Sequence, residues 1–567
     1  MSVANPQSAI PNPQSAIVNV AARMTEYARE SPHQIAVAET AGRDATGKYR
    51  YRQVTYGQLE EDSNRLASGL QQLGVEPGTR MVLLVRPGID FISLVFALFK
   101  VGAVVVLVDP GMGRKNLVRC LADTRPEGFI AVPQVHAVRT LLRRRFPKSR
   151  IHVTAGRRWF WGGVTLEQLR GTGSPQPLEL VRGGSDPAAI IFTTGSTGVP
   201  KGVLYCHSNF DQQVAQIQQR YGIEPGTVDL AAFPLFGLFN NGMGATTIVP
   251  DMDATRPASV DPQDFLTVAH DWNATQSFAS PALWHRVSLY CERNNVRMPT
   301  FRRLLSAGAP VPGRVLARLK AALVDDAQIH TPYGATEALP VASISATEVL
   351  NETQQATDEG AGVCVGSRFP EIEWRVIEMV DGPIASLHDA RLVEAGQIGE
   401  LLVTGPVVTR QYVTRVEANR LGKIADGERV WHRMGDVGYL DDDDRFWFCG
   451  RMTHRVRTAD GTLFTIPCEA VFNTHSSVYR SALVGIGTAD RQRPVLVVEP
   501  TPEYSEGGGN ERELIAQLLE IGARHPHTAA IKDILVRKSL PVDIRHNAKI
   551  FREKLAPWAA KRLGSSK

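Results

Sequence analysis

The chain has 567 residues, more than one hydrophobic core usually supports, and this predicts one large composite domain with at least one smaller domain. Its composition, 43% hydrophobic and 21% charged residues, is that of an ordinary soluble globular protein, and a net charge of +5 gives no reason to expect a nucleic-acid partner. Six scattered cysteines without a CxxC pair favour reduced thiols in a cytoplasmic protein.

The N-terminal segment has no basic start and no apolar core, so it does not resemble a signal peptide. The sequence NPQSAI occurs twice in it, and we interpret residues 1–20 as a disordered leader. The most apolar stretch, from Phe91 to Pro110, approaches the length of a membrane span, but Lys100 and Gly102 divide it. We therefore predict a helix followed by a buried strand there.

Helical and strand patterns alternate over the first two-thirds of the chain. Residues 54–74 form an amphipathic helical pattern that ends at a glycine, and apolar strand patterns follow at residues 81–85 and 128–132. Such alternation predicts a parallel sheet covered by helices. After about residue 396 the pattern changes to short strands and turns, and residues 451–567 have strands and a helix of their own.

A cluster of basic residues precedes the aromatic run Trp159–Trp161. A helix face with solvated arginines explains it, and the alternative is a docking surface for a membrane or for partner enzymes. The sequence leaves both open. The cluster comprises Arg139, Arg143, Arg144, Arg145, Lys148, Arg150, Arg157 and Arg158.

A loop rich in glycine and hydroxyl side chains, IIFTTGSTGVPKG, follows an apolar run at residues 190–202. Its amides, hydroxyls and lysine can form a nest for phosphate oxygens. It is not the GxxxxGK[ST] loop, because a glycine follows the lysine. A flexible surface turn is the alternative, which the Pro-Lys-Gly ending disfavours. The expected phosphate-binding residues are Thr193, Thr194, Gly195, Ser196, Thr197, Gly198 and Lys201.

This loop resembles the phosphate loop of the ATP-dependent adenylating superfamily, which includes acyl-CoA synthetases, peptide-synthetase adenylation domains and luciferases. Further motifs similar to those of the superfamily follow in its order over nearly the whole chain. They are SAGAP at residues 306–310, TPYGATE at 331–337, HRMGDVGYL at 432–440, GRMTHRVRTADG from 450 and HNAKIFREKL at 546–555. Each motif residue taken singly could be an ordinary turn or surface residue, but the shared order argues against coincidence.

The resemblance implies ATP and Mg²⁺ as cofactors and assigns roles to individual residues. Thr336 would contact a phosphate, Glu337 would hold the metal, and Asp436 would bind the ribose hydroxyls. Arg451 matches the arginine of the hinge motif, and Lys549 matches the adenylation lysine. We expect these residues, apart from Asp436, to be catalytic. The adenine side would be formed by Gly308, Ala309, Pro310, Tyr333 and Gly334, with the tyrosine stacked on the base.

The resemblance also implies a fold. It is α/β, with a large N-terminal adenylating domain over residues 21–450, made of parallel-sheet subdomains plus a small β-barrel-like subdomain. A small mobile α+β domain over residues 451–567 would act as a lid and carry the adenylation lysine.

The chemistry requires these residue types, because a carboxylate is a poor electrophile until it is attached to the α-phosphate of ATP. Negative charge then grows on the phosphates, and the metal, the loop donors and the lysine can each offset part of it. Three departures from the CoA ligases count against transfer to a thiol. They are Thr453 at the hinge, a lengthened loop RTADG at residues 457–461, and Gly237 where many acyl-CoA synthetases have histidine.

Three segments resemble a narrower group, the β-lactone synthetases of bacterial long-chain olefin biosynthesis: residues 233–262, 462–475 and 541–559. This resemblance implies that a 2-alkyl-3-hydroxy fatty acid is adenylated and that its own hydroxyl then attacks the activated carbonyl, releasing AMP. It also implies partner enzymes, a reductase and a lactone decarboxylase, in an assembly. The alternatives are a long-chain acyl-CoA or acyl-carrier ligase and a nucleotide-binding protein without catalysis.

Apolar stretches could exclude water and hold alkyl chains, although ordinary core packing explains them as well. The candidate pocket residues are Phe233, Phe236, Gly237, Phe239 and Ser280. The group that accepts the hydroxyl proton is not identified by the sequence. The candidates by residue type are His207, His432 and His454, and the adenylate phosphate is another.

Overall fold

The computed structural model describes residues 19–180, 183–193, 199–233, 236–543 and 549–564. Almost all of the predicted leader, including its repeat, lies outside these ranges. Within them, no helix is both long enough and apolar enough to cross a membrane. The apolar stretch instead forms helix α3 (Ile89–Val101) and strand β4 (Val104–Leu107), as predicted. All six cysteines are free thiols.

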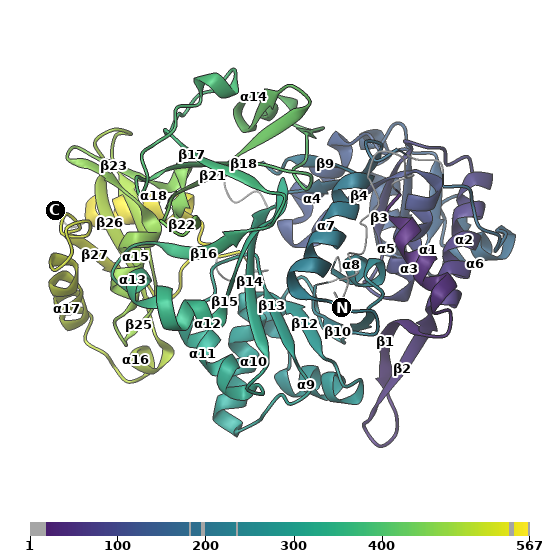
Figure 1. The fold of residues 1–567 in the computed structure, drawn as a ribbon, viewed down its shortest axis with the longest axis horizontal. Helices are drawn as coiled ribbons and strands as arrows, with labels where there is room; N and C mark the ends of the chain where they lie inside the picture. The colour runs from purple at the N-terminus through teal and green to yellow at the C-terminus, as the bar shows by residue number, and fades with distance from the viewer. Residues whose placement is uncertain (1–18, 181–182, 194–198, 234–235, 544–548, 565–567) are drawn as a thin grey trace, which may run out of the picture.

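The first layer is an eight-stranded sheet, and all its strands except β19 belong to the purple and blue part of the chain in Figure 1. Its strand order is β19-β9-β8-β4-β3-β5-β6-β7, and the pairs from β8 to β7 are parallel. Valine-rich, fully buried strands such as β4 are expected where helices cover both faces. The other strands are β3 (Arg80–Leu84), β5 (Gly128–Ala131), β6 (Ile151–Thr154), β7 (Val164–Thr165), β8 (Pro187–Phe192), β9 (Gly202–Cys206) and β19 (Gln411–Tyr412).

Helices around this sheet follow the sequence pattern. Helix α2 (Tyr56–Gln72) begins with a capping box between Thr55 and Gln58, and Gly74 at φ +84° ends the helical path. It packs on α3 through buried residues at helical spacing, including Leu59, Leu66 and Leu70. Helices α5 (Pro133–Leu141) and α6 (Leu166–Thr172) lie nearer the β7 edge.

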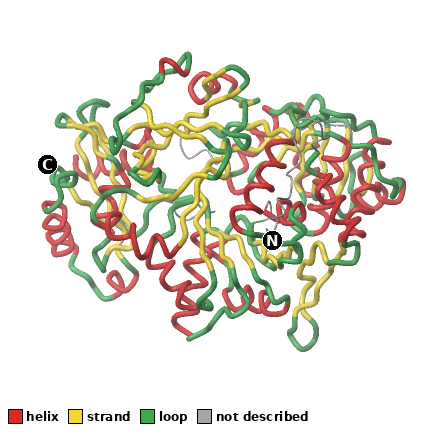
Figure 2. The backbone as a smooth tube through the Cα atoms, viewed as in Figure 1, coloured by secondary structure: helices red, strands yellow, loops and turns green. Residues whose placement is uncertain are grey.

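The second layer is a 14-stranded sheet that runs through the centre of the molecule (Figure 2). Strands β11 (Thr246–Val249), β10 (Val228–Ala231), β12 (Gln276–Ala279), β13 (Arg303–Ser306) and β14 (Gln328–Ala335) pair in parallel. Antiparallel strands continue the sheet from β14. They include β15 (Ala338–Ser345), β16 (Val363–Arg368), β17 (Glu373–Ile377), β18 (Gly399–Thr404), β21 (Arg429–Leu440) and β22 (Arg445–Arg451).

Four helices lie next to this second sheet: α7 (His207–Tyr221), α8 (Phe236–Gly242), α10 (Pro281–Asn294) and α11 (Gly313–Ala322). At its far edge, β1 (Ile35–Arg43) pairs in parallel with β11 and antiparallel with β2 (Tyr49–Thr55). The expected α/β architecture is therefore confirmed, and the short strands predicted after residue 396 are those of the antiparallel part.

The segment after β22 forms its own small α+β unit, at the left of Figure 1. Its sheet consists of β25 (Val478–Ile486), β26 (Arg493–Pro500) and β27 (Asp533–Val536), and α15 (Thr465–Asn473), α17 (Glu511–Ala523) and α18 (Arg552–Gly564) pack on it. Ion pairs connect it to the large part: Asp381 contacts Arg455 at 2.7 Å and Arg457 at 3.2 Å. The division at residue 450 stays a prediction.

Candidate active site

One cavity of about 1700 Å³ lies between the large part and the C-terminal segment. It exceeds the roughly 300–1,000 Å³ of most small-molecule sites, so it has room for more than a nucleotide. The residues expected at the nucleotide site from every motif line it: Thr193, Lys201, Gly308, Ala309, Pro310, Tyr333, Gly334, Thr336, Glu337, Asp436, Arg451 and Lys549. The predicted phosphate-loop residues Thr194, Gly195, Ser196, Thr197 and Gly198 lie outside the described residues.

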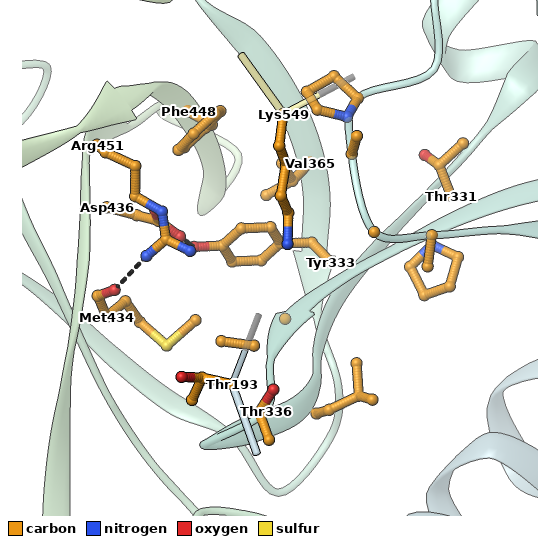
Figure 3. A pocket seen from close by; sticks show the side chains of 18 of the residues that line it. Thr193, Thr331, Tyr333, Thr336, Val365, Met434, Asp436, Phe448, Arg451 and Lys549 are labelled. Atoms are coloured by element: carbon orange, nitrogen blue, oxygen red, sulfur yellow. Dashed lines mark hydrogen bonds and ion pairs between the residues drawn. The ribbon is translucent and has the colours of Figure 1, made fainter. Parts of the chain in front are cut away.

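The expected ribose-binding carboxylate is fixed by two polar side chains. Asp436 on β21 lies opposite Arg451 on β22 in the strand register, and Arg451 Nε is 3.0 Å from Asp436 Oδ1. The hydroxyl of Tyr333 donates to Asp436 Oδ2 at 2.5 Å, and Arg451 Nη1 donates to the Met434 carbonyl at 2.9 Å (Figure 3). Side chains from two other strands, β14 and β22, therefore hold this carboxylate of β21 in place.

Burial raises the pKa of Asp436, and Arg451 and Tyr333 oppose this effect by stabilising the charged form. The charged form of Asp436 thus depends on these neighbours.

Next to Tyr333, Gly334 leaves no room for a side chain, because a Cβ there would lie 2.7 Å from the Ala338 carbonyl oxygen. This explains the glycine in the TPYGATE motif.

Glu337 lies at the turn of the hairpin between β14 and β15, and its carboxylate points to a second polar cluster. Tyr412 donates its hydroxyl to Glu337 Oε1 at 2.7 Å, and Lys201 Nζ lies 3.7 Å from the same oxygen. Lys201 Nζ also donates to the Tyr412 hydroxyl at 3.1 Å. The hydroxyl and the amide of Thr409 donate to the Glu337 carbonyl, each at 2.9 Å, which fixes the turn.

Two hydrogen bonds between its ends close the loop that carries Lys201. The amide of Thr193 donates to the Lys201 carbonyl at 3.0 Å, and the amide of Lys201 donates to the Thr193 hydroxyl at 3.1 Å. This reciprocal pair brings together the two ends of the phosphate loop, so the lysine at its end faces Glu337.

The environment of Glu337 fits a hard divalent cation. Burial opposes ionisation, but interactions with His432 and Lys201 and the hydrogen bond from Tyr412 outweigh it and lower the pKa of Glu337 to about 2. The side chain is therefore a carboxylate, a ligand type that Mg²⁺ prefers. No group of three or more potential ligands among histidine, cysteine and acidic side chains occurs in the described residues. Mg²⁺ can be held by one carboxylate together with substrate phosphates.

Lys549 enters the cavity from the C-terminal segment (Figure 3). Two backbone contacts fix its position: its amide donates to Asp543 Oδ1 and its carbonyl accepts from the Asp543 amide, both at 3.0 Å. An isolated bridge between Val542 and Ile550 supports the same turn. The lysine also lowers the pKa of Asp436 electrostatically. The cationic side chain thus lies near the expected ribose and phosphate positions.

We call a second part of the cavity wall, lined by a connected aromatic cluster, the apolar end. Helix α8 supplies part of this wall and is anchored by two buried amides: Asn240 Nδ2 donates to Asp229 Oδ2 at 2.8 Å, and Asn241 Nδ2 donates to the Ala36 carbonyl at 2.9 Å. Ser280, the N-cap residue of α10, lines the cavity as well. The aromatic and aliphatic lining consists of Phe96, Phe99, Phe210, Val214, Phe233, Leu238, Phe239 and Phe278.

Two residues that we expected in the pocket lie behind its wall. Phe236 is buried and stacks on Phe278 with ring centroids 4.4 Å apart, so it supports the lining without reaching the cavity. Gly237 is packed so tightly that a Cβ would lie 3.0 Å from Thr247 Cγ2 and 3.4 Å from Ile92 Cδ1. A histidine at this position would crowd both neighbours, which accounts for the departure from many acyl-CoA synthetases.

None of the three candidate histidines has the properties of a general base. His207 is buried edge-on against Phe99, away from the cavity lining. His432 and His454 line the cavity, but burial and neighbouring cations lower the pKa of each to about 3. His432 is therefore neutral at pH 7 and carries a charge only in strong acid. At neutral pH, Lys201 and Tyr412 are the groups that stabilise the Glu337 carboxylate.

The sequence did not identify Tyr412 or Lys423. Tyr412 belongs to the short strand β19, which pairs with β9 and so places the ring beside Lys201, 4.3 Å from Nζ to the ring centroid. Lys423 Nζ donates to the Thr409 carbonyl, and burial lowers the pKa of Lys423 to about 7. No motif includes either residue, because their contacts join distant parts of the chain.

Comparison with known proteins supports the interpretation of this cavity as a nucleotide-binding active site. The family model described as "AMP-binding enzyme" matches residues 25–413. An olefin β-lactone synthetase of Xanthomonas campestris pv. campestris is 46% identical over 548 residues, covering 95% of this chain and 97% of that protein. The olefin β-lactone synthetase of Stenotrophomonas maltophilia is also 46% identical, over 552 residues, with coverage of 96% and 98%.

Solved structures of lower identity share the fold. The anthranilate CoA ligase AuaEII in complex with anthranoyl-AMP has a TM-score of 0.77 at 18% identity, covering 97% of this chain and 98% of that chain. ATP-bound MatB from Rhodopseudomonas palustris has a TM-score of 0.75 at 19% identity, with coverage of 96% and 99%. The chain therefore belongs to the AMP-binding enzyme family, as an AMP-forming ligase of the olefin β-lactone synthetase group.

Proposed function

We propose that this protein converts a long-chain 2-alkyl-3-hydroxy fatty acid, ATP and Mg²⁺ into a β-lactone, AMP and pyrophosphate. The observation that carries the proposal is one continuous cavity that is lined both by the nucleotide-site residues and, at its apolar end, by a cluster of aromatic side chains. Similarity over nearly the full length to olefin β-lactone synthetases supports the same reaction.

In the first step, a carboxylate oxygen of the acid attacks the α-phosphorus of ATP and pyrophosphate leaves. Asp436 would position the ribose, and Lys549 would offset the negative charge that grows on the phosphates. Mg²⁺, when bound to Glu337 and the phosphates, would supply further charge stabilisation. Thr193, Lys201 and Thr336 line the same region and would contact the phosphates.

In the second step, the 3-hydroxyl oxygen attacks the activated carbonyl carbon, the bond from that carbon to the AMP oxygen breaks, and AMP leaves. The nucleophile is tethered to the same molecule, so no external nucleophile has to be bound. The apolar end of the cavity would exclude water, which otherwise hydrolyses the adenylate.

We infer that the hydroxyl proton passes to a phosphate oxygen of the departing AMP. The low pKa values of His432 and His454 support this assignment, because a group with a pKa of about 3 is a weak base at neutral pH. The reductase and the lactone decarboxylase implied by the family resemblance would supply the hydroxy acid and consume the lactone.

The test is a product analysis. Purified protein is supplied with ATP, Mg²⁺ and a 2-alkyl-3-hydroxy acid, with and without CoA, and the products are identified by NMR. We expect lactone and AMP in both mixtures. Turnover only with CoA would indicate an acyl-CoA ligase, and binding without pyrophosphate release would indicate a protein without catalysis.

A further inference from the structure

An aromatic loop at the edge of the first sheet exposes large apolar side chains. It consists of residues 155–163 and connects β6 to β7, the last two strands of that sheet. Within it, Trp159 is 50% exposed and Phe160 is 72% exposed. On the neighbouring helix α5, Val138 is 49% exposed and Leu141 is 81% exposed. Single exposed apolar residues are normal, whereas several on neighbouring elements make this region a candidate interaction site.

Polar and aromatic contacts hold the aromatic loop in this position. Trp161 is buried, donates from Nε1 to the Thr154 hydroxyl at 2.9 Å, and stacks on His136 of α5 with ring centroids 5.6 Å apart. The rings of Trp159 and Phe160 lie 5.3 Å and 5.1 Å from that of Trp161. Trp159 and Phe160 therefore pack on the ring of Trp161, whose position is fixed by its contacts with Thr154 and His136.

The chain segment that contains α5 and the aromatic loop has a strong positive charge. From Gly128 to Leu166 there is no aspartate or glutamate, whereas the whole chain carries a net charge of only +5. Of the eight basic residues in this stretch, Arg139 is buried and contacts His152 at 2.8 Å, and the other seven are exposed. These seven are Arg143, Arg144, Arg145, Lys148, Arg150, Arg157 and Arg158.

We propose that the aromatic loop and α5, with the basic residues around them, form a docking surface for an anionic phospholipid membrane. Tryptophan and phenylalanine side chains enter the boundary between headgroups and acyl chains, and arginines attract the anionic headgroups. Charge complementarity favours an anionic occupant, because seven exposed basic side chains stand against one exposed acidic side chain beside them, Glu167, which lines a surface pocket with Arg157 and Arg158. The exposed aromatic side chains favour a lipid surface as that occupant. None of the residues from 128 to 166 lines the active-site cavity, so docking leaves the reaction site free.

Vesicle co-sedimentation of the full-length protein tests this surface. The probes are vesicles of pure phosphatidylcholine and vesicles of phosphatidylcholine with phosphatidylglycerol, at low and high salt. We expect binding to the anionic vesicles only, and weaker binding at high salt. The double variant Trp159→Ser/Phe160→Ser should bind about tenfold more weakly. Replacing Arg143, Arg144 and Arg145 by glutamine should weaken vesicle binding by about tenfold or more. This triple variant should also depend less on salt than the unmodified protein.

Matched controls separate docking from general effects. Leu392, which is 62% exposed, is changed to serine, and the exposed Arg293, Arg491 and Arg524 are changed to glutamine. These controls should bind vesicles like the unmodified protein, and all variants should keep its pyrophosphate exchange rate in solution, which shows that they are folded. The proposal is overturned if the unmodified protein does not bind anionic vesicles at low salt, or if control and patch variants bind equally.

Discussion

The two ends of the cavity are built differently. At the nucleotide end, each functional group is fixed by a specific polar contact, as when Tyr333 and Arg451 hold Asp436. At the apolar end, aromatic side chains form the wall and the polar groups lie behind it, where Asn240 anchors α8 to Asp229. Binding a triphosphate requires particular atoms, whereas an alkyl chain requires only apolar volume. Substitutions at the two ends should therefore affect different kinetic constants.

The largest effect should come from Lys549→Ala at the nucleotide end. We expect pyrophosphate release to fall by about 10²–10³ or more, because the cation offsets charge mainly in the transition state. ATP binding should change little. The measurements are pyrophosphate exchange and calorimetric ATP titration, with Lys554→Ala, an exposed lysine on α18, as the control. A rate near that of the unmodified protein would show that Lys549 has another role.

Glu337→Gln should reduce the rate by about 10², because the amide keeps the shape of the side chain but loses the charge expected to hold Mg²⁺. The variant should also need more Mg²⁺ for half-maximal activity, which a titration with MgCl₂ measures. The exposed Glu371→Gln is the control. If the Mg²⁺ requirement is unchanged, Glu337 is not a ligand.

Phe239→Ala tests the apolar end. Removing this ring from the cavity wall should lower kcat/KM for a long-chain acid by about tenfold, mainly through KM, since apolar contact area is lost. The KM for ATP should not change, and measuring both constants in the same preparation makes ATP an internal control. An equal loss for ATP and acid would contradict the division of the cavity into two ends.

The smallest effect on catalysis should be that of Asp229→Asn, which acts on stability. Burial raises the pKa of Asp229 to about 6, against hydrogen bonds from Asn240 and Gln276. The folded state thus binds a proton that an unfolded chain with a pKa of about 3.9 has lost, so the unfolding free energy should fall by about 3 kcal/mol as pH rises from about 4 past 6.

The asparagine variant should lack this decrease, because its side chain does not ionise. Urea unfolding of both proteins at acidic and at neutral pH measures the difference, and the activity of both at neutral pH should agree. Parallel pH profiles would show that Asp229 is ionised in the folded protein throughout this range.

Much of the nucleotide end could be predicted from the sequence. Its residues occur in short motifs in which glycine and polar side chains have a local reason, such as Gly334 against the Ala338 carbonyl. The helices and strands around residues 54–107 could also be predicted, because the spacing of apolar residues and the helix caps are properties of the local sequence. The apolar end was less predictable, since nothing in the segment 233–239 distinguishes Phe239, which lines the cavity, from Phe236, which does not.

The sequence by itself determined the order of the motifs, the alternation of helices and strands, and the chemical groups available for adenylation. These properties depend on a few neighbouring residues, whose backbone preferences and side chains are fixed by the chain. Only the tertiary structure decided which groups meet. Tyr412 reaches Glu337 across 75 residues of chain. Such contacts form only when strands pair and helices pack, and no single segment of the sequence determines that long-range packing.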